Sequence, residues 1–198
     1  MKSLEMVAPG TALREGIDNI VHAKTGGLIL SGDPEELSFL FSGGIKLDID
    51  YSPAFIYQVA KMDGAIVLNS NATKITAANV QLMPDPTILS LETGTRHRTA
   101  ERVSKQTEAL VIAISARRDV VSLYVDGAKY ILEDIPTVLA KANQALATLD
   151  KYRVRLDQVS TRLTALEFEG GATLHDVLTV LQRSELVTRM AVEIERYI

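Results

Sequence analysis

The spacing of apolar residues predicts alternating helices and short strands over the first two thirds of the chain. Within residues 11–24 the apolar side chains recur at helical intervals and share one face, which is typical of an amphipathic helix. Short apolar runs at 26–32, 63–68 and 108–115 are typical of buried strands. Because a polar turn separates 63–68 from the run at 74–82, we expect these two strands to pair antiparallel.

Turn and cap residues refine this pattern. Ser52 followed by Pro53 is typical of a helix start. Residues 90–107 are expected to lead from a loop into a helix. Asp126-Gly127 lies between two β-branched runs and predicts a hairpin. The mixture favours an α/β fold in which a mixed β-sheet is flanked by helices.

After Pro136 the apolar residues follow a longer helical repeat. A spacing of seven predicts a seam between packed helices. Its members are Ala145, Leu149, Tyr152, Leu156, Val159, Leu163 and Leu166. Gly170-Gly171 interrupts the helix, and Thr173 with Asp176 predicts a new start through a capping box. We expect a second apolar stripe made of Leu174, Val177, Leu181, Val187, Met190 and Ile194.

These features predict two domains. Residues 1–136 hold the mixed sheet, and residues 137–198 form an α-helical linker or bundle segment. The second stripe continues to the end of the sequence without a stop signal or a polar tail. We therefore expect the chain to be the front part of a longer protein.

The composition excludes several classes of site. The 198 residues include no cysteine, which excludes a disulfide framework, a thiolate zinc site and a cysteine nucleophile. The three histidines lie far apart in sequence, which argues against a histidine-rich metal cage. No apolar run reaches the roughly 18 residues of a membrane helix, and no signal peptide is recognisable. We expect a cytoplasmic protein without membrane contact.

Positive charge is concentrated in one short window of an acidic chain. The formal net charge is −4, which argues against general coating of nucleic acid. Within residues 96–105, however, the four cations Arg96, Arg98, Arg102 and Lys105 stand against the carboxylate of Glu101. Such a local basic spot predicts a small anionic ligand rather than a long polyanion.

Two segments carry the candidate chemistry, since neither a P-loop nor a dinucleotide-binding glycine motif is present. The first is Asp63-Gly64-Ala65, at the start of an expected strand. It offers a carboxylate beside a glycine that lets a ligand approach the backbone. On spacing alone, an ordinary Asp-Gly turn is the better explanation of these residues, because Asp-Gly is common in turns.

The second segment runs from Gly94 to Thr99 at the expected start of a helix. Helix N-termini bind anions through free N–H groups and the helix dipole, and threonine and arginine side chains add donors suited to phosphate. A threonine N-cap followed by solvated arginines is the alternative. His97 lies between two arginines, which disfavour its protonated form and suit a neutral donor or a metal ligand. The strand end at 115–118 is either a ligand contact or an exposed charged turn.

Together the two segments resemble the diadenylate cyclase family. A DGA triplet at 63–65 is followed by an RHR triplet at 96–98, and both lie within longer similar stretches. These stretches include VAPGTALREGIDNI, TGGLI, KMDGAI, ANVQLMPD, ETGTRHRTAERVSKQT, VIAIS and KANQALATLDKYR. From about Val7 to Ile198 the sequence is similar to the DNA-integrity scanning members of that family.

This resemblance implies an enzyme that condenses two ATP into cyclic di-AMP and releases two pyrophosphates. It implies a requirement for Mg²⁺ or Mn²⁺ and a mixed sheet followed by a helical linker. It also implies an octamer in the full-length protein and a C-terminal helix-hairpin-helix domain that binds DNA. We expect this chain to lack that domain, so that DNA would be contacted only through a part that is absent here.

The resemblance also implies roles for individual residues. Asp63 matches the acid near the attacking 3′-hydroxyl, and Asp63 and His97 match catalytic and metal-binding positions. Leu82 matches a backbone contact to adenine. The full set of implied ATP contacts is Gly64, Ala65, Leu82, Thr95, Arg96, His97, Arg98, Thr99, Ser115 and Arg118.

A cyclic product requires two reciprocal attacks, and a two-fold axis between facing sites supplies both from one geometry. We therefore expect at least a face-to-face dimer, in which a carboxylate of one protomer meets the triphosphate held by its partner. Two other functions are consistent with the sequence. One is an ATP-binding regulatory module without chemistry, and the other is an oligomerisation scaffold built on residues 137–198.

Overall fold

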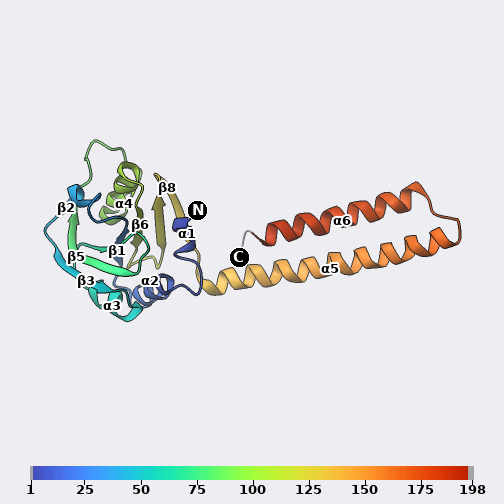
Figure 1. Cartoon of the computed structure of the whole chain (residues 1–198), viewed down its shortest axis with the longest axis horizontal. Helices are drawn as coiled ribbons and strands as arrows, with labels where there is room; N and C mark the ends of the chain where they lie inside the picture. Colours follow the sequence, from blue (N-terminus) through green and yellow to red (C-terminus); the bar gives the residue numbers. More distant parts are fainter. Residues whose placement is uncertain (1, 196–198) are drawn as a thin grey trace. The chain divides into compact units, whose positions relative to one another are not determined.

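The computed structural model describes residues 2–195, which form two compact units. The first unit ends at Leu132 and holds a sheet with its covering helices, and the second begins at Glu133 and consists of two long helices (Figure 1). The sequence placed the boundary between the domains after Pro136, and the long helix that follows begins at Ile135.

A mixed sheet of eight strands lies at the centre of the first unit within the described residues. The strands are β1 Gly27–Ser31, β2 Phe41–Ser42, β3 Ile45–Asp50, β4 Ala65–Leu68, β5 Lys74–Leu82, β6 Leu110–Ile114, β7 Val121–Val125 and β8 Ala128–Leu132. Their order is β2-β5-β4-β1-β6-β7-β8, and β3 also pairs with β5. β1 and β4 are parallel, whereas β4 with β5 and β7 with β8 are antiparallel. The expected mixed sheet, strand pair and hairpin are confirmed.

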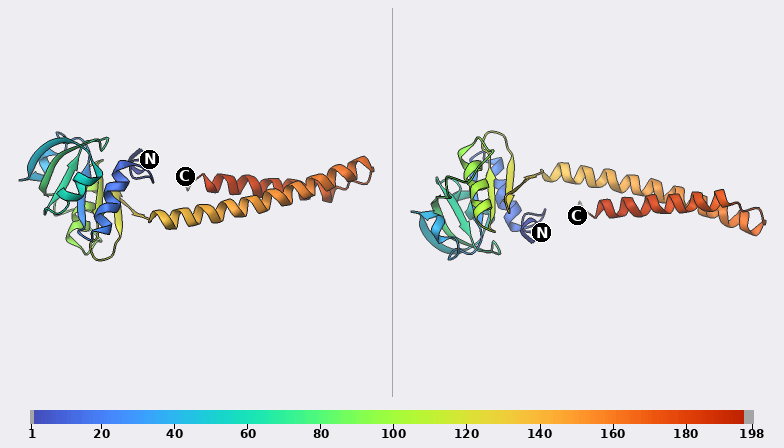
Figure 2. Two further views of the ribbon diagram at one scale, coloured as in Figure 1. Left: turned by 90° about the horizontal axis from the view of Figure 1, so that it is seen from below. Right: turned by 90° about the horizontal axis from the view of Figure 1, so that it is seen from above.

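Helices cover both faces of this sheet (Figure 2). The helical segments of the first unit are α1 Lys2–Glu5, α2 Ala12–His22, the 3₁₀ turn η1 Ser38–Leu40, α3 Pro53–Val59 and α4 Thr95–Gln106. Ile29 packs with α2 and α3 on one face, whereas Leu28 and Leu30 pack with α4 on the other. Because β1 is buried on both faces, its sequence is a continuous apolar run rather than an alternating one.

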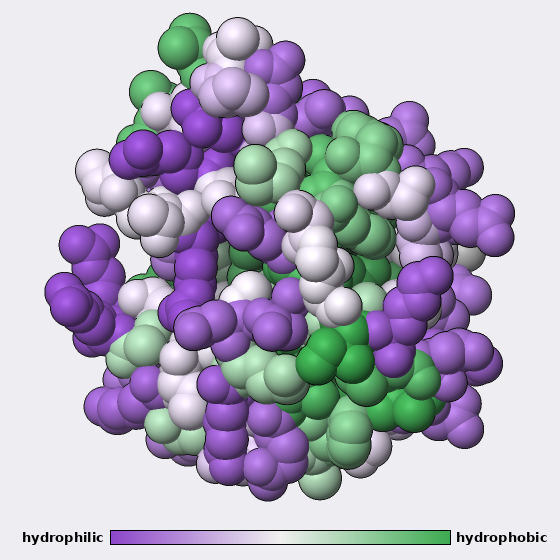
Figure 3. All heavy atoms as spheres, turned by 90° about the vertical axis from the view of Figure 1, so that its left-hand side faces the viewer, coloured by the Kyte–Doolittle hydropathy of each residue, from purple (hydrophilic) through white to green (hydrophobic). Residues whose placement is uncertain are grey.

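The segment from residue 33 to residue 50 holds elements that the apolar pattern did not predict, namely η1, β2 and β3. In β3 the register shifts between Lys46 and Ile49, and Asp48 has a positive φ of 45°. Such a bulge interrupts the regular alternation of a strand. Figure 3 views the molecule from the side of these strands and shows apolar and polar residues side by side on that face. Phe39 and Ile45 are both exposed.

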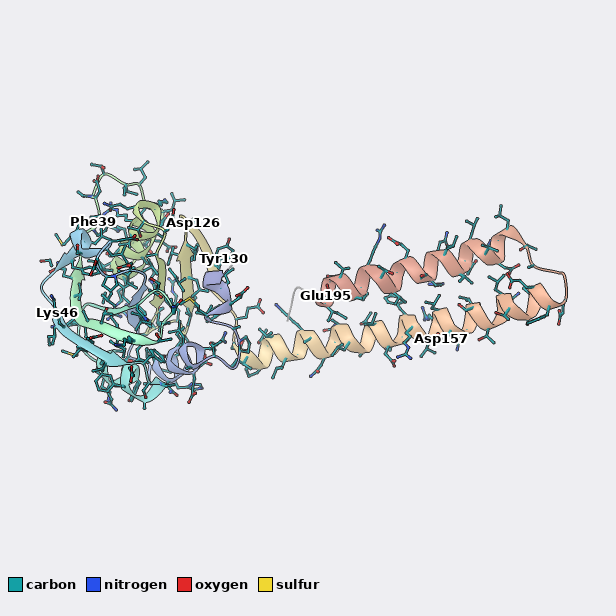
Figure 4. The ribbon with its side chains drawn as sticks, viewed as in Figure 1. Phe39, Lys46, Asp126, Tyr130, Asp157 and Glu195 are labelled. Atoms are coloured by element: carbon teal, nitrogen blue, oxygen red, sulfur yellow. The ribbon has the colours of Figure 1, made fainter. Side chains whose placement is uncertain are left out.

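The second unit is a helical hairpin of α5 Ile135–Phe168 and α6 Leu174–Ile194. The seven predicted seam residues of α5 are all half-buried, while positions between them such as Asp157 are exposed (Figure 4). Thr173 and Asp176 form the predicted capping box at the start of α6. None of the helices in residues 2–195 has both the length and the apolar character needed to cross a membrane.

The predicted apolar stripe of α6 is wrong in its first half. Leu174, Val177 and Leu181 are exposed, whereas Val187 and Met190 are half-buried and Ile194 is buried. The step from Leu181 to Val187 is the cause, because six residues of an α-helix leave their side chains about 120° apart around the axis. The predicted stripe therefore joined residues from two different faces.

Candidate functional site

Most of the residues that the sequence analysis selected lie at one end of the central strands of the sheet. Because β1 and β4 run parallel and β6 runs opposite to β1, the starts of β1 and β4 meet the end of β6 at this end of the sheet. A cavity of about 870 Å³ lies there. Its lining consists of Asp63, Gly64, residues 92–97, residues 114–118, Val120, Ser122, Lys129 and Ile131.

Asp63 and Gly64 lie in a bend just before β4 and form one wall of the cavity. Gly64 has a φ of +86°, and a Cβ there would lie 2.9 Å from the Val80 carbonyl oxygen. Both the conformation and the close approach therefore require glycine. The exposed Asp63 carboxylate forms no hydrogen bond or ion pair with residues 2–195. The Asp-Gly bend thus presents an unpaired carboxylate to the cavity.

The N-terminus of α4 offers unpaired backbone amides to the same cavity. Its N-cap is Gly94, which supplies no side-chain cap, and the first turn contains no acidic residue. The alternative of a threonine N-cap is therefore wrong, since Thr95 is already the first helical residue. Thr95 and Arg96 line the cavity at this end of the helix. Free amides, the helix dipole and a guanidinium together favour an anion.

The basic window divides into two groups with different partners. Arg98, Arg102 and Lys105 donate hydrogen bonds to main-chain carbonyls of residues 88–93, in the loop that precedes α4. Arg96 lines the cavity instead and forms no hydrogen bond or ion pair with the described part of the chain. The prediction of one basic spot for an anion is corrected, because three of its cations hold the loop.

Glu101 anchors the same loop from within. Its Oε2 accepts hydrogen bonds from the Ser90 hydroxyl at 2.5 Å and the Leu91 amide at 3.0 Å, and its Oε1 accepts one from Lys105 Nζ at 2.7 Å. Burial by itself raises the pKa of Glu101, but the hydrogen bonds from Lys105 and Ser90 outweigh it and hold the pKa below 4.5. These hydrogen bonds hold the loop in place, and with it Glu92 and Thr93, which line the cavity.

Glu101→Gln is expected to destabilise the protein by about 2 kcal/mol at pH 7, since the buried charge-assisted bonds are lost. A carboxylate with a lowered pKa contributes stability above pH 4.5 that is lost as the pH falls through its native value. The difference between variant and parent should therefore shrink from pH 7 to pH 4, as urea unfolding would measure. The exposed Glu108→Gln is the control, and equal stability of parent and Glu101→Gln at pH 7 would contradict the expectation.

His97 belongs to a polar cluster whose members Glu92 and Lys129 also line the cavity. Its ring meets the Tyr124 ring edge-on, with centroids 6.5 Å apart. Glu92 Oε1 accepts hydrogen bonds from the Tyr124 hydroxyl at 2.9 Å and from Lys129 Nζ at 2.6 Å. Burial lowers the pKa of His97 most; nearby cations lower it further, and Glu92 partly opposes them. The neutral imidazole is thus favoured, as predicted, although burial contributes more than the flanking arginines.

Several residues that line the cavity were not predicted from the sequence. They are Glu92, Thr93, Ala116, Val120, Ser122, Lys129 and Ile131. The buried Ser122 hydroxyl lies near Tyr124 and forms no hydrogen bond of standard geometry with the described residues. The hairpin at Asp126-Gly127 was the available signal, because it pairs Ser122 with Ile131 and so places both on one face.

Other residues that the resemblance implicated lie outside the lining of this cavity. Ala65 and Leu82 are buried in the core between the sheet and α4. Thr99 is half-buried in α4, and Arg98 is engaged with the loop. The same cavity that Asp63 lines is also lined by Gly64, Thr95, Arg96, His97, Ser115 and Arg118.

The donor set fits a divalent cation that binds together with phosphate. No cluster of three or more metal-ligating side chains exists among the described residues. Asp63 and His97 nevertheless line the same cavity. Mg²⁺ is commonly held by one or two carboxylates together with substrate phosphates. One carboxylate and one neutral imidazole therefore suffice only when the ligand supplies the remaining oxygens.

Comparison with protein families covers nearly the whole chain. Residues 14–129 match the family described as DisA bacterial checkpoint controller nucleotide-binding, and residues 132–198 match the DisA bacterial checkpoint controller linker region. DNA integrity scanning protein DisA of Clostridium botulinum (strain 657 / Type Ba4) is 56% identical over 198 residues, which are 100% of this chain and 56% of that protein. The DisA protein of Carboxydothermus hydrogenoformans is 57% identical over 196 residues, 99% of this chain and 56% of that protein. The chain thus spans little more than half the length of these relatives.

Solved structures share the fold of the first unit. A hypothetical membrane spanning protein from Bacillus cereus superposes with a TM-score of 0.55 and 24% identity, over 62% of this chain and 62% of that one. A double mutant of DacA from Staphylococcus aureus superposes with a TM-score of 0.52 and 23% identity, over 62% of this chain and 85% of that one. At such identities the likeness establishes the fold alone.

Proposed function

Because the chain belongs to the DisA bacterial checkpoint controller nucleotide-binding family, we propose that it is a diadenylate cyclase. It condenses two ATP into cyclic di-AMP with 3′,5′ linkages and releases two pyrophosphates, at the interface of two facing protomers. The observation that carries this proposal is the cavity that is lined both by Asp63 and by the N-terminus of α4, which has no side-chain cap.

Each half of the reaction is a phosphoryl transfer. The 3′-oxygen of one ATP attacks the α-phosphorus of the other, and the bond from that phosphorus to the leaving pyrophosphate breaks. The proton of the hydroxyl passes to the Asp63 carboxylate, which is unpaired in the cavity and free to accept it. A second, reciprocal attack closes the ring.

The remaining residues neutralise and orient the triphosphates. The α4 amides, Thr95 and Arg96 stabilise negative charge that grows on the departing pyrophosphate. Ser115 and Arg118 contribute donors from the end of β6. His97 stays neutral because its site is partly buried among cations. A Mg²⁺ or Mn²⁺ ion held by Asp63 and His97 together with phosphate would supply further charge neutralisation.

Assembly is part of the proposal, since two nucleotides must face each other. A protomer alone binds ATP but does not complete the ring, so at least a face-to-face dimer is required. We propose an octamer for the full-length protein, as the family resemblance implies. DNA contact would belong to the part of the relatives that this chain does not span.

Incubation of the protein with ATP and Mn²⁺, followed by chromatography of the nucleotides, tests the proposal. Cyclic di-AMP should form at high protein concentration. ATP binding in calorimetry without any cyclic di-AMP would instead favour the regulatory module that the sequence left open. Absence of both binding and product would reject a nucleotide function altogether.

Dilution of the enzyme is expected to lower its specific activity, because the facing site disappears when protomers separate. Specific activity should fall in parallel with the mass of the complex in sedimentation measured over the same concentrations. Constant activity in a sample that sediments as a monomer would contradict the two-protomer site.

A further inference from the structure

Gly26 immediately precedes β1, at the end of the sheet where the cavity lies. The register of β1 with β6 pairs its neighbour Gly27 with Ile114, whose strand end lines the cavity. Gly26 has a φ of +68°, in the left-handed region that side chains disfavour. Its conformation alone would allow asparagine as well as glycine.

The surroundings of Gly26 leave room for a side chain only if the Arg96 guanidinium moves away. A Cβ at this position would lie 2.7 Å from Nη1 of Arg96, 3.0 Å from the Ile114 carbonyl oxygen and 3.1 Å from Cβ of Ala116. The guanidinium of Arg96 therefore lies directly over the Gly26 backbone. Gly27 differs, since a Cβ there would meet nothing nearer than 3.8 Å.

The close approach to Gly26 orients the Arg96 side chain. Its guanidinium makes no hydrogen bond or ion pair within residues 2–195, and the residue is exposed. A long cationic side chain without polar partners loses considerable rotamer entropy when a ligand fixes it. Packing against the Gly26 backbone restricts the conformations of the Arg96 side chain before the ligand binds.

We propose that Gly26 is a positioning residue for Arg96. Because Gly26 has no side chain, the guanidinium can lie over the start of β1 and the end of β6, where it faces a bound phosphate group. This inference rests on the proposed function, in which Arg96 contacts the triphosphate. Any side chain at residue 26 displaces the guanidinium from that position and weakens phosphate binding through Arg96.

Gly26→Ala is the direct test, measured as ATP affinity by calorimetry and as the rate of cyclic di-AMP formation. We expect both to fall about 10- to 100-fold, the loss that corresponds to one charge-assisted hydrogen bond to phosphate. Gly43→Ala is the control for backbone strain, because Gly43 has a φ of +67° and a Cβ there would have nothing within 4 Å. Gly27→Ala is the control for position. Both controls should stay within about twofold of the parent.

The double variant Gly26→Ala/Arg96→Ala separates positioning from a general structural role. If Gly26 acts through Arg96, Gly26→Ala should not lower ATP affinity further once Arg96 is alanine. An equal loss in both backgrounds, or an equal loss in Gly43→Ala, would overturn the proposal. So would unchanged affinity in Gly26→Ala alone.

Thermal unfolding of each variant checks that the fold is intact. If Gly26→Ala does not fold, Gly26→Asn replaces it, since asparagine tolerates the left-handed region and still adds a Cβ. If neither variant folds, Gly26 is a purely structural glycine and the proposal is rejected. Because the cycle is measured by affinity, it remains decisive even when the parent binds ATP without forming cyclic di-AMP, an outcome that would reject the proposed function alone.

Discussion

Asp63→Asn is expected to reduce cyclic di-AMP formation by about 10³-fold, the size of effect typical for loss of a general base. The amide has nearly the same shape as the carboxylate but cannot accept the proton of the attacking hydroxyl. ATP affinity without metal should change little, because the triphosphate is held by α4 and the neighbouring cations rather than by Asp63. Single-turnover formation of product and metal-free calorimetry measure the two quantities separately.

Asp48→Asn is the matched control, since Asp48 is an exposed aspartate on β3 paired only with Lys74 at the surface. It should leave both turnover and ATP affinity unchanged. Normal turnover in Asp63→Asn would reject the role of this carboxylate. Loss of metal-free ATP binding would show instead that Asp63 serves the structure of the site.

The sequence was sufficient for elements whose pattern reflects local burial. β1 and β6 are buried on both faces and consist of uninterrupted apolar runs. The strand β3 was missed because a bulge at Asp48 separates its ladder pairs and because Ile45 is exposed. In α6 the apolar residues of two faces were joined across a six-residue step, since nothing in a single helix says which face its partner covers. The choice of packing partner is a tertiary property, and it explains the error in α6.

The candidate site was predictable only where one segment carries its own signal. Asp63-Gly64 and the start of α4 do so, through a bend that requires glycine and a helix start without a side-chain cap. Lys129 does not, because it joins the cavity only through the pairing of β7 with β8. The prediction that all four cations of residues 96–105 face one anion was wrong for a related reason. In sequence, a cation that binds a ligand cannot be distinguished from one that binds a loop carbonyl. Arg96 and Arg102 differ only in what the fold places opposite them.

A mixture of two inactive variants is expected to make a product that neither makes alone. In the proposed reaction, each attack needs Asp63 from the protomer that holds the attacking nucleotide and Arg96 from the protomer that holds the attacked one. In a dimer of Asp63→Asn with Arg96→Ala, one of the two attacks retains both residues. The reciprocal attack lacks both.

The mixed dimer should therefore form the first phosphodiester and release one pyrophosphate, but fail to close the ring. The linear dinucleotide, which keeps the 5′-triphosphate of the attacking ATP, should accumulate in place of cyclic di-AMP. Chromatography with mass detection distinguishes the two, at ATP concentrations high enough to saturate the Arg96→Ala protomer. Each variant alone should form neither product beyond trace amounts.

Asp63→Asn mixed with Asp63→Asn/Arg96→Ala is the control, because no attack in that dimer has a carboxylate available, and it should yield no linear product. If the first mixture gives nothing, Asp63 and Arg96 must act within one chain on the same attack. If it gives cyclic di-AMP at the parent rate, the two residues do not belong to reciprocal sites. The linear product alone is consistent with two identical cavities, each of which contains an unpaired carboxylate and a helix end, facing each other across a two-fold axis.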